Sequence, residues 1–596
     1  MLFLDISCLW PSWISLSYVG TWTSLSSISQ ATWEAFNTTL SGRLHEGAPM
    51  MSSCYPSMNN PTEQQDPTQC AAEQSLLLNA NLASNEFSWY SNFVWSACQT
   101  TGASCPIPAS LATNSTCQQG SISPRYVAVQ SVEDVQATLN FTRTHGLRLV
   151  IKNTGHDYRG RSSAPDSLAL WMHPYQPPIQ LLKDFTPEGC PAPTGDVIKF
   201  GAGQQFKGIY DFVQARGYRV VGGGCDSVGA AGGWITGGGH GLLANELGLG
   251  VDNVQEIKVV LPNGTYATAT RCQNPDLFFA LRGGGGGTFG VVMEMNTLVH
   301  PDRPMMVLNV SLTGLEPSSS AKDITALFIE HAERWAAEGW GGFLIPGVTE
   351  YTIVMATALL NYSDAMASVQ PVLDLAREMK AKAPATTATL NRVDGFLEFL
   401  GPVSSSPLLL TSEVSTAVSS RIIPRTAFQN ATSRAQLTDL IYELLISNDT
   451  LPTPPSLRVE ILLVAPALYS QTLAAEDQAS GPGASSVTPA WRTGLWHVMH
   501  TRLLDSRITD PEIIRQVWQS VSRAMDPLRE FTPGSGAYQN EGDPFEPDPI
   551  GAFWGEENYD RLLRIKEEVD PENLLTVHQG VGWDRTDARF KCFPDV

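Results

Sequence analysis

The pattern of apolar and polar positions in the first half of the chain predicts one structural unit that occurs twice. In the first copy, an apolar strand at 126–129 precedes a helix that Ser131 can cap at its start and Gly146 can end. A second apolar strand follows at 147–151. His156, within the sequence IKNTGHDYRG, therefore lies in the loop that leaves a buried strand.

The second copy consists of a strand at 197–200, a helix through Phe206 and Val213, a terminating Gly217 and a strand at 218–221. It leads into the glycine-dense sequence GGGCDSVGAAGGWITGGGHG. Because two similar units pack side by side, we expect their following loops to meet in one place.

Further along, alternating strands surround a hairpin turn at Asn263-Gly264, and five glycines in PDLFFALRGGGGGTFGVV separate a helix from a strand. After that the pattern changes to longer strands and helices with Pro- and Ser-rich connectors, before a final helix in NYDRLLRIKEEVD. These changes predict a cysteine-bearing N-terminal extension with some helix, a loop-bearing domain, a second domain and a returning C-terminal segment, at 1–120, 121–303, 304–530 and 531–596.

The length of 596 residues predicts two or three domains with room for a buried cofactor. The formal net charge of −21 disfavours binding to nucleic acid or to anionic membrane surfaces. No later stretch approaches the roughly 20 apolar residues of a membrane span, so none is expected.

Two features predict secretion. Sequons for N-glycosylation are spread along the chain at Asn37, Asn114, Asn140, Asn263, Asn309, Asn361, Asn430 and Asn448. Cysteines crowd an early segment, as disulfides formed in an oxidising compartment would, at Cys54, Cys70, Cys98, Cys105 and Cys117. Their pairing stays open, and the apolar segment 1–20 is a poor signal peptide because it lacks a basic start and contains Asp5.

Glycine-rich loops near 153–163, 222–241 and 283–290 are the candidate site. A backbone without Cβ atoms can approach a ligand and aim its N–H groups at phosphate oxygens. The loops fit neither a Rossmann fingerprint nor a Walker motif. Together they predict a cradle for a dinucleotide pyrophosphate and a flavin edge, whereas the alternative interpretation is flexible surface loops.

Several motifs occur in a characteristic order: PRYVAVQSVEDV, IKNTGHDYRGRSS, VVGGGCDSVGAAGGWITGGGHG, DLFFALRGGGGGTFGVV and YQNEGDP with WGEENYDRLLRIKEEVDPENLL. In this order they resemble the FAD-linked oxidases of the vanillyl-alcohol oxidase/p-cresol methylhydroxylase superfamily, in particular the berberine-bridge-enzyme-like branch that includes secreted fungal oxidases. The resemblance implies an α+β protein with a two-subdomain FAD-binding fold and an α+β substrate domain built on an antiparallel sheet.

The resemblance also implies bicovalent FAD. By family analogy, a ring nitrogen of His156 is joined to the flavin 8α carbon and the sulfur of Cys225 to flavin C6. Imidazole and thiolate are suitable nucleophiles, and a loop dipole can lower a thiol pKa. The alternatives are a surface histidine and, since Asp226 stands where plant relatives often have proline, a cysteine without a flavin bond.

The remaining site residues follow from the same motifs. The cofactor is expected to contact Asn153, Thr154, Gly155, Asp157, Tyr158, Gly160, Arg161, Ser162, Gly224, Val228, Gly229, Gly232, Gly233, Gly237, Gly239, Gly241 and Val292. Asp157 with Arg159 or Arg161 could instead only cap its loop. Tyr538 and Asn540 match the family's Tyr-x-Asn and are the catalytic candidates, although Tyr538 could equally be a core aromatic.

No metal is expected, because the histidines lack tight ligand spacing, and His240 is interpreted as a pocket-wall or structural residue. The resemblance implies a monomeric, secreted oxidase that passes hydride from an alcohol, a carbohydrate or a secondary metabolite to FAD, with O2 as acceptor and H2O2 as product. The rival hypotheses are an oxidative cyclase of secondary metabolism, which an apolar pocket would favour, and a flavin-holding protein without turnover.

Overall fold

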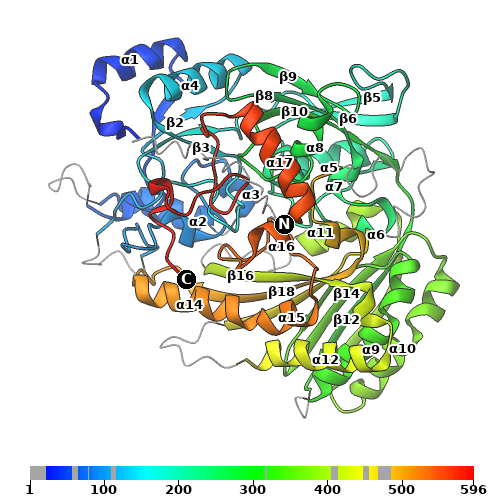
Figure 1. Cartoon of the computed structure of the whole chain (residues 1–596). Coiled ribbons are helices and arrows are strands. Elements are labelled where there is room, and N and C mark those ends of the chain that lie inside the picture. The colour runs from blue at the N-terminus through cyan, green and yellow to red at the C-terminus, as the bar shows by residue number, and fades with distance from the viewer. Residues whose placement is uncertain are drawn as a thin grey trace, which may run out of the picture.

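The computed structural model describes residues 22–56, 65–77, 79–108, 116–315, 319–404, 414–447, 456–466 and 485–596. The predicted export segment 1–20 and the sequons at Asn114 and Asn448 lie outside these residues. In Figure 1 the N-terminal half lies above a large sheet from the second half, and helix α17 near the C-terminus returns to the upper part. The predicted α+β class with antiparallel sheets is confirmed.

The first repeated unit folds within a residue or so of its predicted strand bounds. Its elements are β2 (Arg125–Ala128), α4 (Val132–His145) and β3 (Arg148–Lys152). The Ser131 hydroxyl accepts a hydrogen bond from the backbone N–H of Asp134 and caps α4. Gly146 ends the helix with a φ of 62°, which glycine adopts without strain. β3 then delivers the chain into the loop that carries His156.

These strands form a four-stranded sheet within the described residues. β2 and β3 flank β4 (Ser167–Trp171) in parallel, and β1 (Leu44–Glu46) pairs antiparallel with β2. The N-terminal extension therefore contributes one edge strand to this sheet. The division of the chain into four segments remains a proposal.

A five-stranded antiparallel sheet contains the first strand of the second unit. Its strands, in spatial order, are β5 (Gln180–Phe185), β6 (Gly195–Gly201), β10 (Val291–Leu298), β8 (Val254–Val260) and β9 (Tyr266–Ala269). After β6, helix α5 (Phe206–Gln214) buries one apolar face, formed by Phe206, Ile209, Tyr210 and Val213. The predicted hairpin joins β8 to β9, and Gly264 in its turn has a φ of 88°.

The last strand of the second unit is shorter than predicted. β7 (Tyr218–Arg219) pairs with β11 (His300–Pro301), whereas the expected strand ran over 218–221. Val220 and Val221 are buried where the chain enters the glycine loop. The loop contains a π-helical turn at Ala230–Trp234.

The second half of the chain forms a seven-stranded antiparallel sheet in the described residues. In spatial order its strands are β15 (Thr387–Val393), β12 (Met305–Thr313), β14 (Glu350–Thr357), β13 (Gly341–Pro346), β17 (Ser456–Leu463), β18 (Gly494–Asp505) and β16 (Val414–Pro424). The helices packed on one face are α9 (Ser319–Ala337), α10 (Tyr362–Lys380), α12 (Ala431–Ile446) and α14 (Pro511–Ala524). Figure 1 shows them on the side away from the upper half.

The alternation of side chains along these strands leaves the other sheet face toward the glycine loops. On β17, Val459 and Ile461 join the core beneath the helices, whereas Glu460 and Leu462 face a cavity. On β18, Val498 joins that same core. The sheet is therefore one wall of the site.

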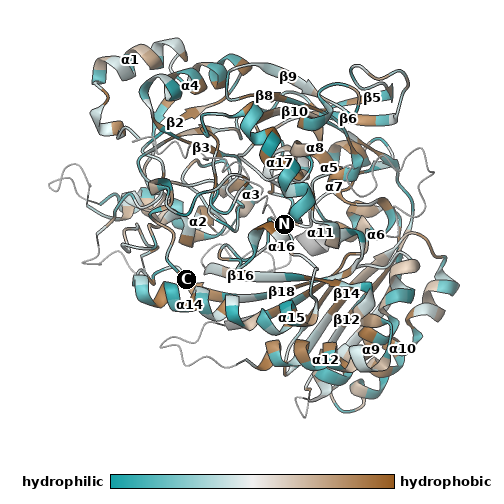
Figure 2. Ribbon diagram, in the orientation of Figure 1, coloured by the Kyte–Doolittle hydropathy of each residue, from teal (hydrophilic) through white to brown (hydrophobic). Residues whose placement is uncertain are grey.

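The remaining helices are short or cover the edges. They are α1 (Gln30–Thr39), α2 (Pro67–Leu77), α3 (Ala80–Ala83), α6 (Ala244–Leu247), α7 (Gly250–Asn253), α8 (Pro275–Leu281), α11 (Phe396–Ser404), α15 (Asp526–Phe531), α16 (Pro549–Phe553) and α17 (Glu556–Val569). Figure 2 shows teal and brown residues side by side along α14, whose Val517, Trp518 and Val521 are buried. None of the helices in the described residues is both long and apolar enough to span a membrane.

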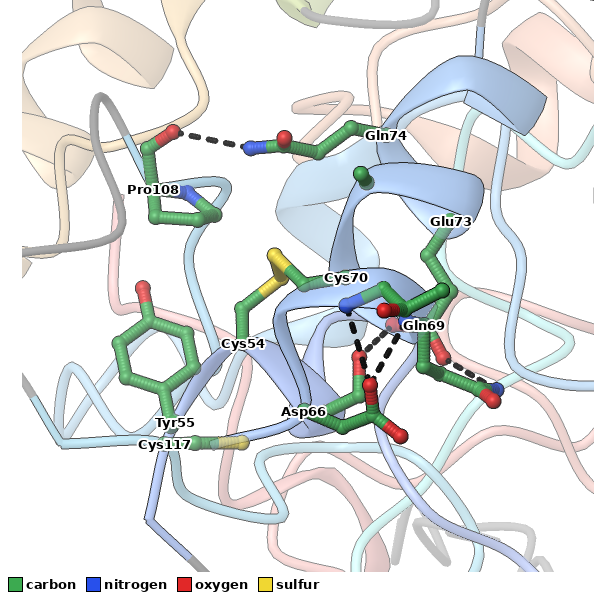
Figure 3. Close-up of a disulfide and its surroundings, with 12 residues drawn as sticks. Cys54, Tyr55, Asp66, Gln69, Cys70, Glu73, Gln74, Pro108 and Cys117 are labelled. Atoms are coloured by element: carbon green, nitrogen blue, oxygen red, sulfur yellow. Dashed lines mark hydrogen bonds between the residues drawn. A yellow bond between two sulfur atoms is a disulfide. The ribbon is translucent and has the colours of Figure 1, made fainter. Parts of the chain in front are cut away.

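Disulfides connect the predicted cysteine-rich segment internally and to the end of the chain. The bonds found are Cys54–Cys70, Cys98–Cys592, Cys105–Cys117 and Cys190–Cys272. Figure 3 shows the disulfide of Cys70, which lies on α2. Asp66 caps the first turn of this helix, because Oδ1 of Asp66 accepts hydrogen bonds from the backbone N–H groups of Thr68 and Gln69, each at 3.0 Å. The bond between Cys98 and Cys592 joins positions 494 residues apart and ties the extension to the C-terminal tail.

Candidate active site

The glycine-rich loops and the open face of the large sheet enclose a cavity of about 340 Å³. The structure brings most of the predicted site residues to it. Those that line it are Asn153, Thr154, Gly155, His156, Asp157, Tyr158, Arg161, Ser162, Gly224, Cys225, Val228, Gly229, Gly232, Gly233, Gly241, Val292, Tyr538 and Asn540.

Three predicted cofactor contacts do not line this cavity, and close packing explains each. A Cβ on Gly160 would lie 2.4 Å from the ring of Trp95. One on Gly237 would lie 2.2 Å from Oδ1 of Asn540, and one on Gly239 would lie 2.9 Å from the ring of Trp234. These glycines allow neighbouring side chains to approach the backbone.

His156 lines the cavity as a neutral imidazole. Its Nε2 lies 2.9 Å from the hydroxyl oxygen of Ser227, and its ring packs edge-on against Trp89 with centroids 5.2 Å apart. Burial, together with the charge of Lys152, lowers the pKa of His156 to about 3. A neutral ring keeps a lone pair, which nucleophilic attack requires.

Cys225 shares the Ser227 hydroxyl with His156. Its sulfur lies 3.3 Å from that oxygen, and it is the free cysteine among the described residues. The expected lowering of its thiol pKa is not found. Burial raises the pKa, and the hydrogen bonds from Ser227 offset this only in part. Loss of solvent around the thiol is therefore the largest effect on its pKa.

A chain of polar contacts links the first loop to the C-terminal segment. Asp157 pairs with Arg161, whose Nη2 donates to Oδ1 of Asn540 at 2.9 Å. Nδ2 of Asn540 donates in turn to the Tyr538 hydroxyl at 2.7 Å. Arg159 instead points into the C-terminal segment and donates to the Gln539 carbonyl at 3.2 Å. Asp157 and Arg161 therefore fix the loop as well as line the cavity.

Tyr538 is buried at the cavity wall. Burial raises the pKa of its hydroxyl above the usual range, and the negative charge of Glu541 raises it further. Its ring packs edge-on against His240 with centroids 4.8 Å apart. The nearby charge of Arg161 favours the phenolate, but its effect is smaller than that of burial.

The sequence reasoning missed a cluster beside Tyr538. Nε2 of His240 and Nε2 of His497 each lie 2.9 Å from Oε2 of Glu541. Although burial alone would raise it, the two histidines hold the pKa of Glu541 below its usual range. Two features of the sequence could have indicated this cluster. Glu541 directly follows the predicted site residue Asn540, and His497 lies on the same strand face as Met499, which lines the cavity.

The opposite wall of the cavity is mainly apolar. Its apolar members from the large sheet are Phe343, Val418, Leu462, Met499 and Leu503, and Val464 lines the cavity just after the end of β17. The polar exceptions are Thr416, Thr501 and the ion pair of Arg458 with Glu460, whose atoms lie 3.1 Å apart. Burial raises the pKa of Glu460, and Arg458 opposes this.

Sequence comparison matches two of the parts of the chain that line this cavity. A family described as "FAD binding domain" matches residues 123–270, and one described as "Berberine and berberine like" matches residues 537–582. The FAD-linked oxidoreductase ffsJ of Aspergillus flavipes is 31% identical, over 92% of this chain and 92% of its own length. The chain belongs to the FAD-linked oxidoreductases.

Solved structures of other members have the same fold. The VAO-type flavoprotein MtVAO713 from Myceliophthora thermophila C1 aligns with a TM-score of 0.80 at 26% identity, over 93% of this chain and 95% of its own. The Acremonium strictum glucooligosaccharide oxidase aligns with a TM-score of 0.59 at 18% identity, over 77% of this chain and 91% of its own, which shows the fold alone. The predicted family and its flavin-binding fold are confirmed.

The cavity of this FAD-linked oxidoreductase fits its cofactor. A Cβ built on Gly224 or Gly233 meets no atom within 4 Å, so the backbone there is open to a ligand. His156 and Cys225 offer two nucleophilic atoms that share one hydrogen-bonding partner, Ser227. Asn153 lies beneath Gly229, where a Cβ would come within 2.3 Å of its Nδ2. The loop therefore follows a path that only glycine permits.

Proposed function

We propose that the protein oxidises a small, largely apolar molecule at a carbon that bears a hydroxyl or an amine. FAD would accept the hydride and pass the electrons to O2, giving H2O2. The apolar sheet wall facing the glycine loops is the observation that carries the proposal, because apolar lining with few polar groups recognises apolar ligands. On the sheet wall, a carbohydrate would find polar partners only in Thr416, Thr501 and the ion pair of Arg458 with Glu460.

His156 and Cys225 are the proposed tethers, through the ring nitrogen and the sulfur. The unpaired state of Cys225 supports this role, because the other described cysteines form disulfides. The neutral state of His156 supports it as well. The remaining predicted loop residues would orient the cofactor with backbone N–H groups and the Asp157–Arg161 pair.

Tyr538 and Asn540 are proposed to orient the donor. Since burial keeps Tyr538 protonated, its hydroxyl can donate a hydrogen bond to the donor's heteroatom. Asn540 fixes that hydroxyl at 2.7 Å. The open sheet face would hold the apolar remainder of the donor and exclude water.

An oxidative cyclase of secondary metabolism is the second candidate, and the same apolar wall favours it. In that case the donor would lose two hydrogens and close a ring. We also propose a secreted monomer that does not bind nucleic acid or membranes, supported by the disulfides and the net charge of −21. The sequons at Asn140 and Asn263 are exposed, as glycosylation requires.

The test is anaerobic mixing of the yellow holoenzyme with benzylic and allylic alcohols, amines and oligosaccharides. Bleaching of the visible flavin absorbance by the apolar donors, followed by H2O2 release on adding air, is expected. Bleaching by oligosaccharides alone would contradict the apolar-donor assignment. No bleaching by any donor would favour a flavin-holding protein, and ring closure in the isolated product would favour the cyclase.

A further inference from the structure

We propose that His240 accepts the proton that the donor loses, and that Glu541 and His497 hold it for this role. The inference rests on the proposed function, because it concerns the hydroxyl or amine proton of that donor. It replaces Tyr538 as the candidate base and leaves that tyrosine a hydrogen-bond donor.

Three distant parts of the chain build this arrangement. His240 ends the second glycine loop, His497 lies on β18, and Glu541 belongs to the C-terminal segment. Their donor and acceptor atoms all lie within 4.8 Å of one another. The domain that carries the loops, the large sheet and the returning tail must therefore be assembled before the cluster exists.

The protonation pattern follows from the shared oxygen. An ionised carboxylate can only accept hydrogen bonds, so Nε2 of both His240 and His497 must carry the proton directed at Glu541. Neutral His240 then has its lone pair on Nδ1. Within the described residues this Nδ1 has no hydrogen-bond partner, and the ring lines the cavity. A carboxylate that holds one ring nitrogen and leaves the other to take a proton is the arrangement of a histidine base.

Exposure separates the roles of the two histidines. The side chain of His240 is 13% exposed and that of Glu541 is 23% exposed, whereas His497 is fully buried at 0%. Burial lowers the pKa of His497, although Glu541 offsets part of this. His497 therefore stays neutral and orients the carboxylate, while His240 can reach a donor.

Carboxyl groups lie close to His240. Glu541 is in direct contact with it, and Glu460 on β17 adds a second negative group that Arg458 partly balances. On the other side stand the protonated hydroxyl of Tyr538 and the charge of Arg161 near that tyrosine. A proton on His240 would form an ion pair with Glu541 rather than an isolated buried charge.

The reaction balances with this acceptor. The donor carbon gives a hydride to FAD, and the attached O–H or N–H gives its proton to Nδ1 of His240. The donor loses two electrons and becomes a carbonyl or an imine. The electrons reduce O2, and with the proton from His240 and the transferred hydrogen they leave as H2O2.

Chemical modification of the holoenzyme tests the assignment without needing a donor. Diethyl pyrocarbonate acylates a ring nitrogen that has an available lone pair, so we expect it to carbethoxylate His240 at Nδ1, because the ring lines the cavity. Glu541→Gln should change the rate of this reaction, because an amide at this position no longer fixes the His240 proton on Nε2. Exposed His45 on β1 is the internal reference, and His497 should not react. An unreactive His240, or the same rate of carbethoxylation in wild type and Glu541→Gln, would overturn the assignment.

Kinetics provide the second arm. His240→Asn should slow flavin reduction by an accepted donor about 10²–10⁴-fold, with flavin content and reoxidation of dithionite-reduced flavin by O2 unchanged. Glu557→Gln, on exposed α17 surface, is the control and should keep the wild-type rate. A His240→Asn rate close to wild type would refute the base, as would a transition metal present at one equivalent in the purified holoenzyme. If none of the donors reduces the flavin of the wild type, the proposed function is contradicted instead. The chemical modification result still decides whether His240 is the proton acceptor.

Discussion

A buried ion pair fastens the C-terminal helix α17 to the third glycine loop, and we expect its removal to destabilise the protein strongly. Nζ of Lys566 donates to Oδ2 of Asp570 at 2.5 Å and to the carbonyl of Thr288 at 3.0 Å. The Lys566 side chain is 3% exposed and that of Asp570 is 0% exposed. Thr288 belongs to the loop beside the cavity, so the pair connects the returning segment to the site.

The perturbation is Asp570→Ala, which leaves the lysine buried without its counter-ion. Breaking a buried pair from one side typically destabilises by about 3–5 kcal/mol. The carboxylate also accepts hydrogen bonds from the backbone N–H groups of Leu574 and Leu575, and each orphaned donor adds about 1 kcal/mol or more. Burial already lowers the pKa of Lys566, so loss of its proton relieves part of this. A net loss of about 3–5 kcal/mol is therefore expected.

The assay is thermal unfolding of the holoenzyme, followed by circular dichroism and by flavin fluorescence. For a domain of about 200 residues, a loss of this size lowers Tm by roughly 6 °C or more. The matched control is Asp276→Ala, which removes an ion-pair partner of Arg561. Arg561 lies on α17, as Lys566 does, and its side chain is 38% exposed, whereas that of Asp276 is 66% exposed. An exposed pair contributes about 1 kcal/mol or less. Equal, small shifts in both variants would refute the reasoning.

Further predictions concern the same core. Burial lowers the pKa of Lys152 from 10.5 to about 7, so the unfolded chain binds a proton that the folded chain lacks between these values. Wild-type stability should therefore fall as the pH falls from 10.5 to about 7, and Lys152→Met should gain most in Tm at the lower end; an equal gain at all pH values would contradict this. Replacing Cys98 and Cys592 with serine should lower Tm through a loss of up to about 5 kcal/mol, and an unchanged melting curve would show that the bond is dispensable. Gly237→Ala should displace the Asn540 side chain and slow flavin reduction by an accepted donor, with a wild-type rate as the contradicting result.

Local sequence pattern predicted the repeated units well because their signals are local. Ser131 caps the start of α4 and Gly146 ends the helix, and both residues are directly next to it in the sequence. Asn263 and Gly264 form the turn between two strands that lie within a few residues of them. The strand expected at 218–221 was too long, because the partner β11 offers only two residues. Pairing partners are not visible in a single stretch of sequence.

For the candidate site as well, residues in local motifs could be predicted and contacts between distant residues could not. His156 and Cys225 could be named because each stands in a recognisable motif, and the structure places both at one cavity. The contact of Glu541 with His240 and His497 joins residues far apart in the chain, and no local pattern encodes it. The thiol pKa of Cys225 depends on the atoms that exclude water from it, so the loop sequence alone gave the wrong direction.

The packing glycines show a further limit. Gly160 and Gly237 stand in motifs that suggest cofactor contact, yet each faces a side chain from elsewhere in the chain. Glycine permits close approach of any group. Whether that group is a ligand or a neighbouring ring is decided by tertiary structure.

The most direct test of the account is the visible spectrum of the purified protein before and after acid precipitation, with His156→Ala, Cys225→Ala and the double variant beside wild type. The account predicts that the yellow colour stays in the wild-type pellet, that each single variant keeps it through its remaining bond, and that only the double variant releases all of the flavin. Release of all flavin from wild type would contradict covalent attachment. A protein that stays colourless after expression with ample FAD would contradict the flavin site itself.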